Sequence, residues 1–268
     1  AGGVYDPRTY DDRLLLGLKG TFSEAQWYNM RTQLYAALLN KARRGELAIR
    51  LPIGYDRLDD GTVVLVPARE VQSAIRLVFD QFERLGSAHA VLCYFRDQRL
   101  EVPRKVQTGP NAGEVYWARA SYQAIYHILK QPAYAGAYTY GKQHRVRVPG
   151  AQLKVVTRSL PLDEWAVVIQ DAFPGYITWE QYLRHQAQLH ENAMGAFWTK
   201  GAPRDGVALL QGIAVCGRCG RALHALYRRF PAYVCQAQTQ QYGERHCQRF
   251  SVSHVDPAVE ALFFEAIQ

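Results

Sequence analysis

The sequence predicts an α+β protein in which a long helix and a mixed helical domain precede a small domain of short strands. Apolar residues recur at helical spacing through the first two thirds of the chain, a strong turn signal lies near residue 60, and four of the five cysteines fall in the last quarter. The 268 residues are 48% hydrophobic and 21% charged, which is typical of a folded globular chain. At about 100–200 residues per domain, this length favours two domains, with three short domains as the alternative.

A long helix is expected from Ser23 to Arg44. Ser23 and Gln26 have the spacing of a capping box, and apolar residues follow at three- and four-residue steps. Lys41, Arg43 and Arg44 crowd its last turn, where cations suit the helix dipole. Residues 1–20 are expected to be irregular.

The middle of the chain predicts a hairpin followed by helices with serine N-caps. Asp59-Asp60-Gly61 is a turn signal between two apolar runs, and Gly86 separates two helical patterns. We expect a hairpin over Leu51–Pro67, helices over Arg69–Leu85, Ser87–Gln98 and Ser121–Lys130, and a strand over Ala135–Tyr140.

The segment that follows is basic, contains proline and glycine and has little periodicity, which predicts a linker over residues 146–160. Short apolar runs and two further helical patterns come after it. We expect strands over Trp165–Ile169, Leu209–Val215, Ala222–Tyr227 and Ala232–Cys235, a helix over Thr178–Glu191, and a last helix that begins at Asp256-Pro257.

Four cysteines have the spacing of a metal site. Cys216 and Cys219 form a C-x2-C knuckle followed by glycine, and Cys235 and Cys247 come after them. Zn²⁺ takes four tetrahedral nitrogen or sulfur ligands, and four thiolates supply them with no open position. The sequence therefore predicts one structural zinc ion per chain, with these four cysteines as its ligands.

Other readings of the cysteines remain open. The second pair is not another C-x2-C, so His224 or His246 could replace a ligand. A disulfide pair or free thiols are the further alternatives. Cys93, between Leu92 and Phe95 on an apolar helix face, is expected to be a buried core thiol.

The charge of the chain suits a polyanionic partner. Lys and Arg number 32 against 24 Asp and Glu, for a net charge of +8. Residues 200–250 carry eight basic and two acidic side chains, and residues 141–158 carry five basic side chains and no acid. Basic stretches with aromatic residues between them are typical of nucleic-acid binding, although a basic protein without such a partner has the same composition.

No membrane or secretory segment is expected. The longest apolar runs are far shorter than the 18–20 residues or so of a membrane span, and residues 1–3 have no features of a signal peptide. We expect a cytoplasmic protein.

Several motifs in a fixed order resemble one family. They are DRLLLGLKGTFSE (12–24), NKARRGE (40–46), PIGY (52–55), VQSAIRLVF (71–79), PAYAG (132–136) and CGRCGR (216–221). Together they resemble the large serine recombinases, which are the site-specific integrases and transposases of phages and mobile elements. The resemblance covers nearly the whole chain.

The resemblance implies an order of domains. In the family a catalytic domain with a serine nucleophile precedes a long helix, a recombinase DNA-binding domain, a zinc-ribbon DNA-binding domain and a coiled coil. Here it implies the tail of a catalytic domain at 1–22, the long helix at 23–44, the recombinase domain at 45–145, the basic linker at 146–160, and the zinc-ribbon domain at 161–268, ending at the root of the coiled coil. The family's catalytic motif has no match, because Ser23 and Ser121 have the setting of helix caps, so no catalytic residue is assigned and the chain is expected to be non-catalytic.

The function that this implies is sequence-specific binding of double-stranded DNA, at the half-sites of an attachment site or transposon end, for recombination and DNA integration. Self-association is expected for the longer protein and is expected to be weak or absent in this chain. The resemblance also implies a bacterial or phage-encoded, nucleoid-associated protein. The helix over Ser121–Lys130 is the candidate for recognition in the major groove. The candidate DNA contacts are Lys41, Arg43, Arg44, Arg104, Lys105, Arg119, Tyr122, Gln123, Lys142, Arg145, Arg147, Arg218, Arg221, Arg228 and Arg229.

Two other classes stay open. One is a zinc-ribbon transcription regulator or RNA-binding module unrelated to recombination. The other is an enzyme that uses Asp163-Glu164 or His190-Glu191 as acid and base, although neighbouring residues on a strand or helix do not face one point.

Overall fold

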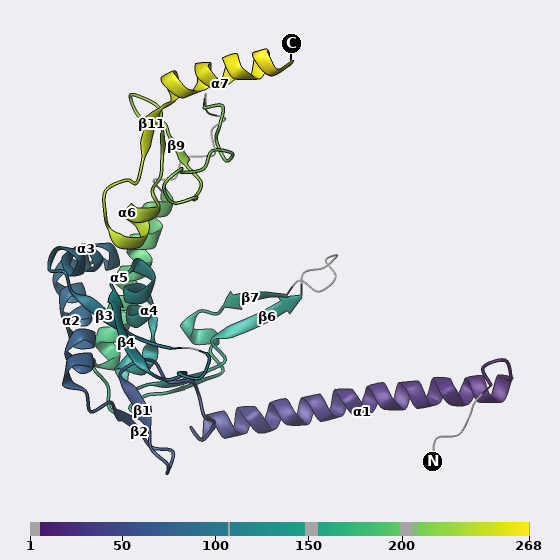
Figure 1. Ribbon diagram of the computed structural model, residues 1–268. Helices are drawn as coiled ribbons and strands as arrows, with labels where there is room; N and C mark the ends of the chain where they lie inside the picture. Colours follow the sequence, from purple (N-terminus) through teal and green to yellow (C-terminus); the bar gives the residue numbers. More distant parts are fainter. Residues whose placement is uncertain (1–5, 107, 148–154, 199–205, 207, 268) are drawn as a thin grey trace. The chain divides into compact units, whose positions relative to one another are not determined.

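The computed structural model describes residues 6–106, 108–147, 155–198, 206 and 208–267 (Figure 1). The chain divides into two compact units. One contains Ala1–Arg50 and Ala137–Ala172, and the other contains Leu51–Gly136 and Phe173–Gln268. The chain therefore passes from one unit to the other three times. Among the residues that the structure describes, no helix combines the length and apolar composition needed to cross a membrane.

The first unit begins with helix α1, Tyr10–Arg43, which starts 13 residues earlier than expected. The prediction of an N-terminus at Ser23 is wrong, because Ser23 lies within the helix and Thr9 is the N-cap residue. Asp11 and Asp12 occupy the first turn, where negative charge suits the helix dipole. The leucine-rich residues before Ser23 are good helix formers and extend the helix through the capping-box pair.

The apolar stripe of α1 is exposed over most of its length. Trp27 is 69% and Leu34 59% exposed, whereas Ala42, near the C-terminal end, is fully buried. That end is held within the unit, since the hydroxyl of Tyr138 donates to the carbonyl of Leu47 at 3.0 Å. The remainder of the helix therefore has an apolar face that nothing in the described chain covers.

The rest of the first unit consists of two antiparallel strand pairs. Strand β5 (Tyr138–Tyr140) pairs with β8 (Val167–Ile169), and a short 3-10 helix, η2 (Leu162–Glu164), precedes β8. Between them, β6 (Gln143–Arg147) pairs with β7 (Val155–Ser159). The expectation of a linker over 146–160 is therefore wrong where the structure describes it, because residues 146–147 and 155–159 lie in paired strands. The flanking strands β5 and β8 also pair with each other.

The second unit has a helical core. Helices α2 (Arg69–Leu85), α3 (Ala88–Asp97) and α4 (Tyr122–Lys130) surround a cluster of fully buried side chains that includes Ile75, Leu92 and Ile125. The hydroxyls of Ser87 and Ser121 cap α3 and α4, as predicted. Two hairpins accompany the helices: β1 (Tyr55–Arg57) with β2 (Val63–Leu65), and β3 (Glu101–Lys105) with β4 (Val115–Arg119).

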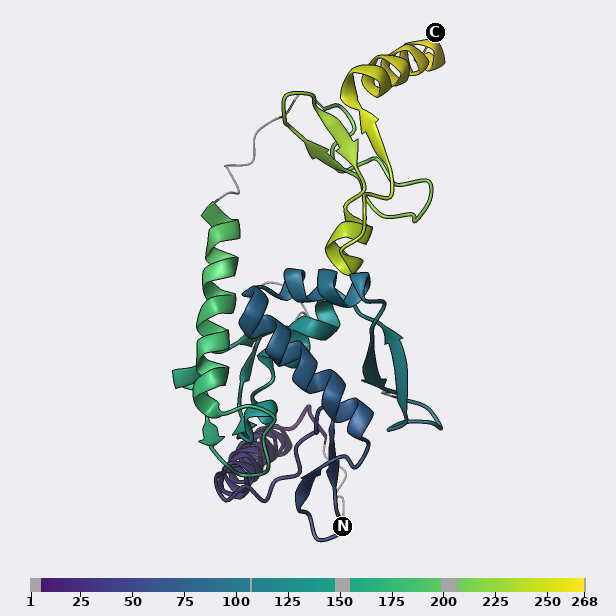
Figure 2. The ribbon, with the colours of Figure 1, turned by 90° about the vertical axis from the view of Figure 1, so that its left-hand side faces the viewer.

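Helix α5 (Trp179–Trp198) belongs to this same core (Figure 2). The predicted start at Thr178 is confirmed, and the structure adds a capping box, since Thr178 and Gln181 exchange side-chain-to-backbone hydrogen bonds at 3.2 and 2.9 Å. Leu189 of α5 is buried in the core cluster, and the Tyr182 hydroxyl donates to the carbonyl of Lys130. The prediction that the zinc-ribbon domain begins at residue 161 is therefore wrong for α5, which packs in the helical core instead.

The last part of the second unit is a small three-stranded sheet. Strands β9 (His224–Leu226), β10 (Ala232–Val234) and β11 (Arg249–Ser251) lie in the order β11-β10-β9, with helix α6 (Ala237–Tyr242) between β10 and β11 in sequence. The predicted strand over Leu209–Val215 is wrong in its described residues, which form turns and a single bridge from Val215 to Ala222.

The C-terminal helix α7 (Val252–Ile267) starts four residues before the expected Asp256. Asp256 is buried and bonds outside the helix. Its carboxylate accepts from the backbone N–H of Leu209 at 2.9 Å and from the Tyr233 hydroxyl at 2.7 Å. The predicted cap residue therefore fixes the first turns of α7 against the sheet.

Tyrosines form hydrogen bonds beside the positions where the chain enters and leaves the second unit. The hydroxyls of Tyr134 and Tyr176 donate to the carbonyls of Ile53 and Gly54, each at 2.9 Å. The backbone N–H of Tyr176 donates in turn to the carbonyl of Tyr134 at 2.7 Å. Burial raises the pKa of Tyr176 to about 12, so its hydroxyl keeps its proton at neutral pH.

The close approach at Gly136 gives a prediction about stability. Gly136 has φ +69°, and a Cβ there would lie 2.5 Å from the carbonyl oxygen of Phe173. Gly86 has the similar φ of +71°, but a Cβ there would meet open space. Gly86→Ala should therefore cost only the left-handed backbone strain of about 1–2 kcal/mol. Gly136→Ala should cost about 1–3 kcal/mol more, the usual penalty of overpacking, in a urea unfolding titration. Equal losses for the two variants would contradict the close approach.

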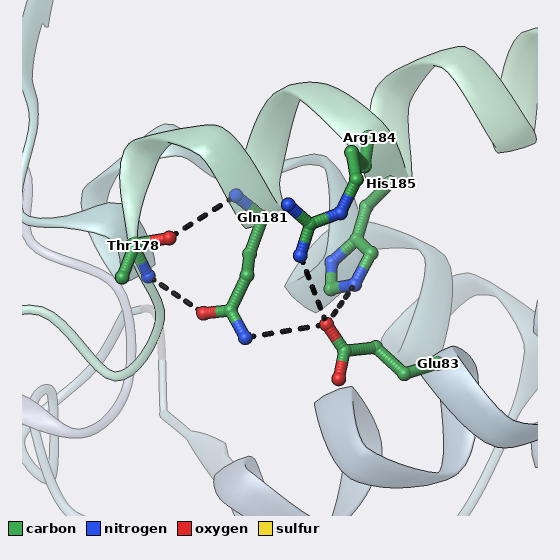
Figure 3. Close-up of polar contacts among 5 residues, drawn as sticks. All are labelled: Glu83, Thr178, Gln181, Arg184 and His185. Atoms are coloured by element: carbon green, nitrogen blue, oxygen red, sulfur yellow. Dashed lines mark hydrogen bonds and ion pairs between the residues drawn. The ribbon is translucent and has the colours of Figure 1, made fainter.

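A buried histidine joins α5 to α2. His185 is 4% exposed and lies against the rings of Phe79 and Phe82, with centroids 5.9 and 5.1 Å away. Its Nε2 lies 3.5 Å from Glu83 Oε1, and that oxygen also contacts Gln181 and Arg184 (Figure 3). Burial lowers the pKa of His185 below its ordinary 6.5, while the Glu83 carboxylate opposes the shift.

The lowered pKa of His185 predicts a loss of stability in acid. The unfolded chain takes up a proton near pH 6.5 that the folded chain does not, so the free energy of unfolding should fall as pH drops below about 6.5. His185→Phe should weaken that pH dependence, and His190→Phe, on the exposed side of the same helix, should leave it unchanged. Thermal unfolding between pH 5 and 8 tests both, and a pH dependence equal in all three proteins would refute this role.

Candidate metal centre and nucleic-acid interface

Four cysteines meet at one end of the small sheet. Cys216 and Cys219 lie in a tight turn that is closed by the N–H of Gly220 donating to the carbonyl of Cys216 at 2.8 Å. Gly220 has φ +68°, the left-handed conformation that suits glycine. Cys235 directly follows β10, and Cys247 lies just before β11. Residues 31 positions apart thus converge because the strands pair antiparallel.

The sulfur positions fit a tetrahedral ion. All four Sγ atoms lie within 4.8 Å of one another. The Cys216–Cys247 and Cys219–Cys235 sulfur separations are 3.6 and 3.4 Å. Zn–S bonds of about 2.3 Å in a tetrahedron place sulfurs about 3.8 Å apart, so a zinc ion fits with small adjustments. The described cluster contains no histidine; Nδ1 of His246 lies 3.2 Å from the Thr239 hydroxyl instead.

The knuckle favours a thiolate. Burial opposes ionisation of Cys216, but hydrogen bonds from the backbone N–H groups of Cys219 and Arg218 outweigh it and lower its pKa to about 7. Burial raises the pKa of Cys247 to about 12, and its contact with the Cys216 sulfur acts in the same direction. The Cys216 thiol is thus prepared for a cation, whereas Cys247 needs the charge of the ion itself to lose its proton.

Two groups of predicted DNA contacts lie in the first unit. Lys41, Arg43 and Arg44 are exposed at the end of α1, where Arg44 pairs with Glu46 at 2.8 Å. The second group, Lys142, Arg145 and Arg147, lies about 100 positions later in the sequence, at the base of the β6–β7 hairpin and in β6. The structure brings these two basic segments into one compact unit.

A third group surrounds the N-terminus of α4. Arg104 Nη2 donates to the hydroxyl of Ser121 at 2.7 Å, and Lys105 lies 3.8 Å from Asp56. Arg119 contacts the Glu244 carboxylate and lies 4.3 Å from the centroid of the Tyr242 ring.

In α4 itself, the two predicted contacts differ in their surroundings. The Gln123 side chain is exposed in the first turn of the helix. Tyr122 is half-buried and stacks on Tyr126, with ring centroids 5.7 Å apart.

The fourth group is on the small sheet. Arg218, Arg221, Arg228 and Arg229 are all exposed. Arg221 donates to Gln241 at 2.7 Å, while Arg228 and Arg229 lie in the turn between β9 and β10.

Sequence reasoning missed an apolar surface on β4. Val115, Tyr116 and Trp117 are consecutive and 41–45% exposed, although such runs are normally covered in a strand. Because β3 and β4 form a sheet of only two strands, other elements would have to pack on both faces of β4 to bury these side chains. In the described residues neither face is fully covered. The aromatic composition of the strand was visible in the sequence, but its exposure depends on the number of neighbouring strands.

Two family models match the chain in sequence order. The Recombinase model matches residues 69–192, and the model of the recombinase zinc beta ribbon domain matches residues 209–268. The chain belongs to the large serine recombinases. The resemblance drawn from the sequence motifs is thereby confirmed, as is the α+β fold class with a recombinase domain before a zinc ribbon. The recombinase model extends through residue 192 and therefore includes the β6–β7 hairpin and most of α5.

The chain is also similar to a curated protein at substantial identity. It is 42% identical over 274 residues to the uncharacterized protein y4bA/y4pH of Sinorhizobium fredii, and the match covers 99% of this chain. The chain spans 39% of the length of that relative.

Two solved structures have a weaker likeness to the recombinase chain. One is described as a crystal structure of an LSR–DNA complex and the other by the sequence requirements of the Listeria innocua prophage attP site. Each is 14% identical with a TM-score of 0.36 and covers 85% of this chain, which spans 64% and 85% of the two structures respectively.

The cysteine cluster of the recombinase predicts zinc-dependent folding of the small sheet. Cys219→Ser removes one of four ligands, so it should lower the zinc content and expose residues 209–267 to proteolysis. The helical core should stay folded, because it has its own buried cluster. Cys93→Ser, on α3 outside the cluster, should keep its zinc. Elemental analysis of the purified proteins with limited proteolysis is the measurement; protein purified without zinc that resists proteolysis would contradict the prediction.

Proposed function

We propose that this chain is the DNA-binding portion of a large serine recombinase, which recognises duplex half-sites at an attachment site or transposon end. The observation that carries the proposal is the pair of recombinase domain models in family order on a chain of net charge +8. Serine recombination requires each subunit to bind duplex DNA while a nucleophile acts. The recombinase domain and the zinc ribbon of this chain would bind that duplex.

Helix α4 is the best candidate for reading sequence. Ile125 and Leu129 anchor it in the core, while Gln123 is exposed in its first turn. An exposed glutamine at this place can form paired hydrogen bonds with an adenine edge in the major groove. Arg104, bonded to the cap residue Ser121, would pair with a phosphate there, because the free N–H groups of a helix N-terminus also favour an anion.

The other basic groups would contact phosphates and set register. They comprise the end of α1 with Lys41, Arg43 and Arg44, the segment with Lys142, Arg145 and Arg147, and the arginines of the zinc ribbon. One zinc ion per chain, held by the four cysteines, would keep the ribbon folded and take no part in chemistry, because four thiolates leave no open position.

The exposed face of α1 fits a further part of the proposal. A stripe that includes Trp27 and Leu34 needs an apolar partner, and a recombinase acts as an assembly of subunits. We expect this contact to form in the longer protein and to be weak in this chain alone.

DNA titrations of matched variants test the proposal. The native chain should bind a duplex selected from a randomised pool more tightly than a scrambled one. Arg43→Ala should weaken both by a similar factor, because a phosphate contact is blind to sequence. Gln123→Ala should instead narrow the gap between them by about 1–3 kcal/mol, the value of one good bidentate base contact. Fluorescence anisotropy at several salt concentrations is the measurement.

Two results would redirect the interpretation. Equal binding of selected and scrambled duplexes would remove the claim of half-site recognition. Tighter binding of single-stranded RNA than of duplex DNA would favour the alternative of an RNA-binding zinc-ribbon module.

A further inference from the structure

The β6–β7 hairpin has an unusual charge for a structural element. Residues 141–158 carry five lysines and arginines and no acidic residue. The side chains whose exposure the structure describes, at positions 143–144 of β6 and 156–159 of β7, are all exposed, and they include His144 and Arg158. A short two-stranded sheet of this kind buries almost no apolar surface, so its sequence is free to serve a purpose other than core packing.

The register of the hairpin distributes basic positions on both of its faces. His144 lies opposite Arg158, Arg145 opposite Thr157, and Arg147 opposite Val155. Successive positions of a strand alternate between faces, so positions 144 and 145 belong to opposite faces. A ligand that surrounds the hairpin on two sides would therefore meet positive charge on each side.

The base of the hairpin is fixed rather than loosely attached. The N–H of Leu160 donates to the carbonyl of Lys142 at 2.9 Å, and Trp165 Nε1 donates to the carbonyl of Leu160 at 3.0 Å. The Lys142 ammonium lies 5.8 Å from the centre of the Trp165 ring, and burial lowers its pKa. A Cβ at Gly141, where φ is +76°, would lie 2.6 Å from Ala166 Cβ. The β6–β7 hairpin is thus oriented before any ligand binds, which reduces the entropy lost on binding.

We propose that the β6–β7 hairpin is a DNA-binding arm that lies along a groove of the duplex and pairs its cations with phosphates on both groove walls. A two-stranded sheet has strands about 4.8 Å apart and fits the major groove, which is about 12 Å wide. Polar residues at exposed positions, such as Gln143 and Thr157, add donors for phosphate or base edges. The complete absence of acids favours a polyanion over a second copy of this chain.

The arm shares its unit with the basic end of α1. Ala42 is fully buried there, and the end of α1 packs against β8. Arg43 and the arm therefore belong to one compact unit and would contact one stretch of duplex. This inference rests on the proposed DNA binding, and it joins the predicted contacts Lys142, Arg145 and Arg147 with Arg158 in one binding element where the sequence predicted a linker.

Two matched triple variants of the full chain test the arm. Arg145→Gln, Arg147→Gln and Arg158→Gln together remove three arm cations. The control combines Arg13→Gln, Arg31→Gln and Arg69→Gln, which removes the same charge from exposed positions elsewhere. Each phosphate contact contributes about 0.9 to the logarithmic salt slope, so the arm variant should lose about 2–3 in slope. Its affinity for selected and scrambled duplexes should fall about tenfold or more at 0.1 M salt, and the control should change by less than about threefold.

The outcomes separate this inference from the function on which it rests. If the native chain binds no duplex, both fail. If it binds and the two triple variants match in affinity and slope, the arm is refuted while DNA binding stands. An equal loss on single-stranded RNA would also refute an arm specific for duplex. Circular dichroism checks folding; should the arm variant unfold, Arg158→Gln with rescue by Arg158→Lys provides the comparison, and absence of rescue would overturn the charge role.

Discussion

The structure depends on hydrogen bonds between tyrosine hydroxyls and backbone carbonyls at the three places where the chain changes units. Tyr134 and Tyr176 bind the carbonyls of residues 53 and 54, which lie just after the first crossing, and the backbone of Tyr176 binds that of Tyr134 across the second and third. Each buried carbonyl would otherwise lose water without a replacement, at a cost of about 1–3 kcal/mol. The three crossings are therefore pinned at one place in the second unit.

This pinning explains how a basic hairpin can be inserted into a helical domain. Residues 137–172 leave the second unit and return to it, and the N–H of Phe173 donates to the carbonyl of Gly136 at 3.3 Å, so the insertion begins and ends at one point. An insertion with adjacent ends adds little strain to its host. The host core can then be built mainly from helices, while the inserted segment is free to carry charge and bind a ligand.

The sequence predicted individual helices and their caps better than it predicted which elements pair or pack together. Helix caps at Ser87, Ser121 and Thr178 were recognised because a capping residue acts within three positions of itself. The cysteine cluster was recognised because zinc imposes a fixed ligand set. The β6–β7 hairpin was missed because its short strands do not alternate apolar and polar residues, and basic residues with glycine and proline are typical of linkers. The capping-box spacing at Ser23 predicted the wrong helix start, because a capping box is a local signal that a longer helix can override.

The same distinction explains why helix α5 was placed in the wrong domain. Its boundaries follow from its own sequence, but its partners follow from three-dimensional packing. His185 needs aromatic neighbours and a carboxylate, and α2 supplies both through Phe79, Phe82 and Glu83. Helix α5 therefore completes the helical core before the chain enters the zinc ribbon. Since that core also orients α4, the residues after 172 determine how firmly the proposed recognition helix is held. The DNA recognition that we propose for this helix therefore depends on residues that the sequence alone assigns to the second domain.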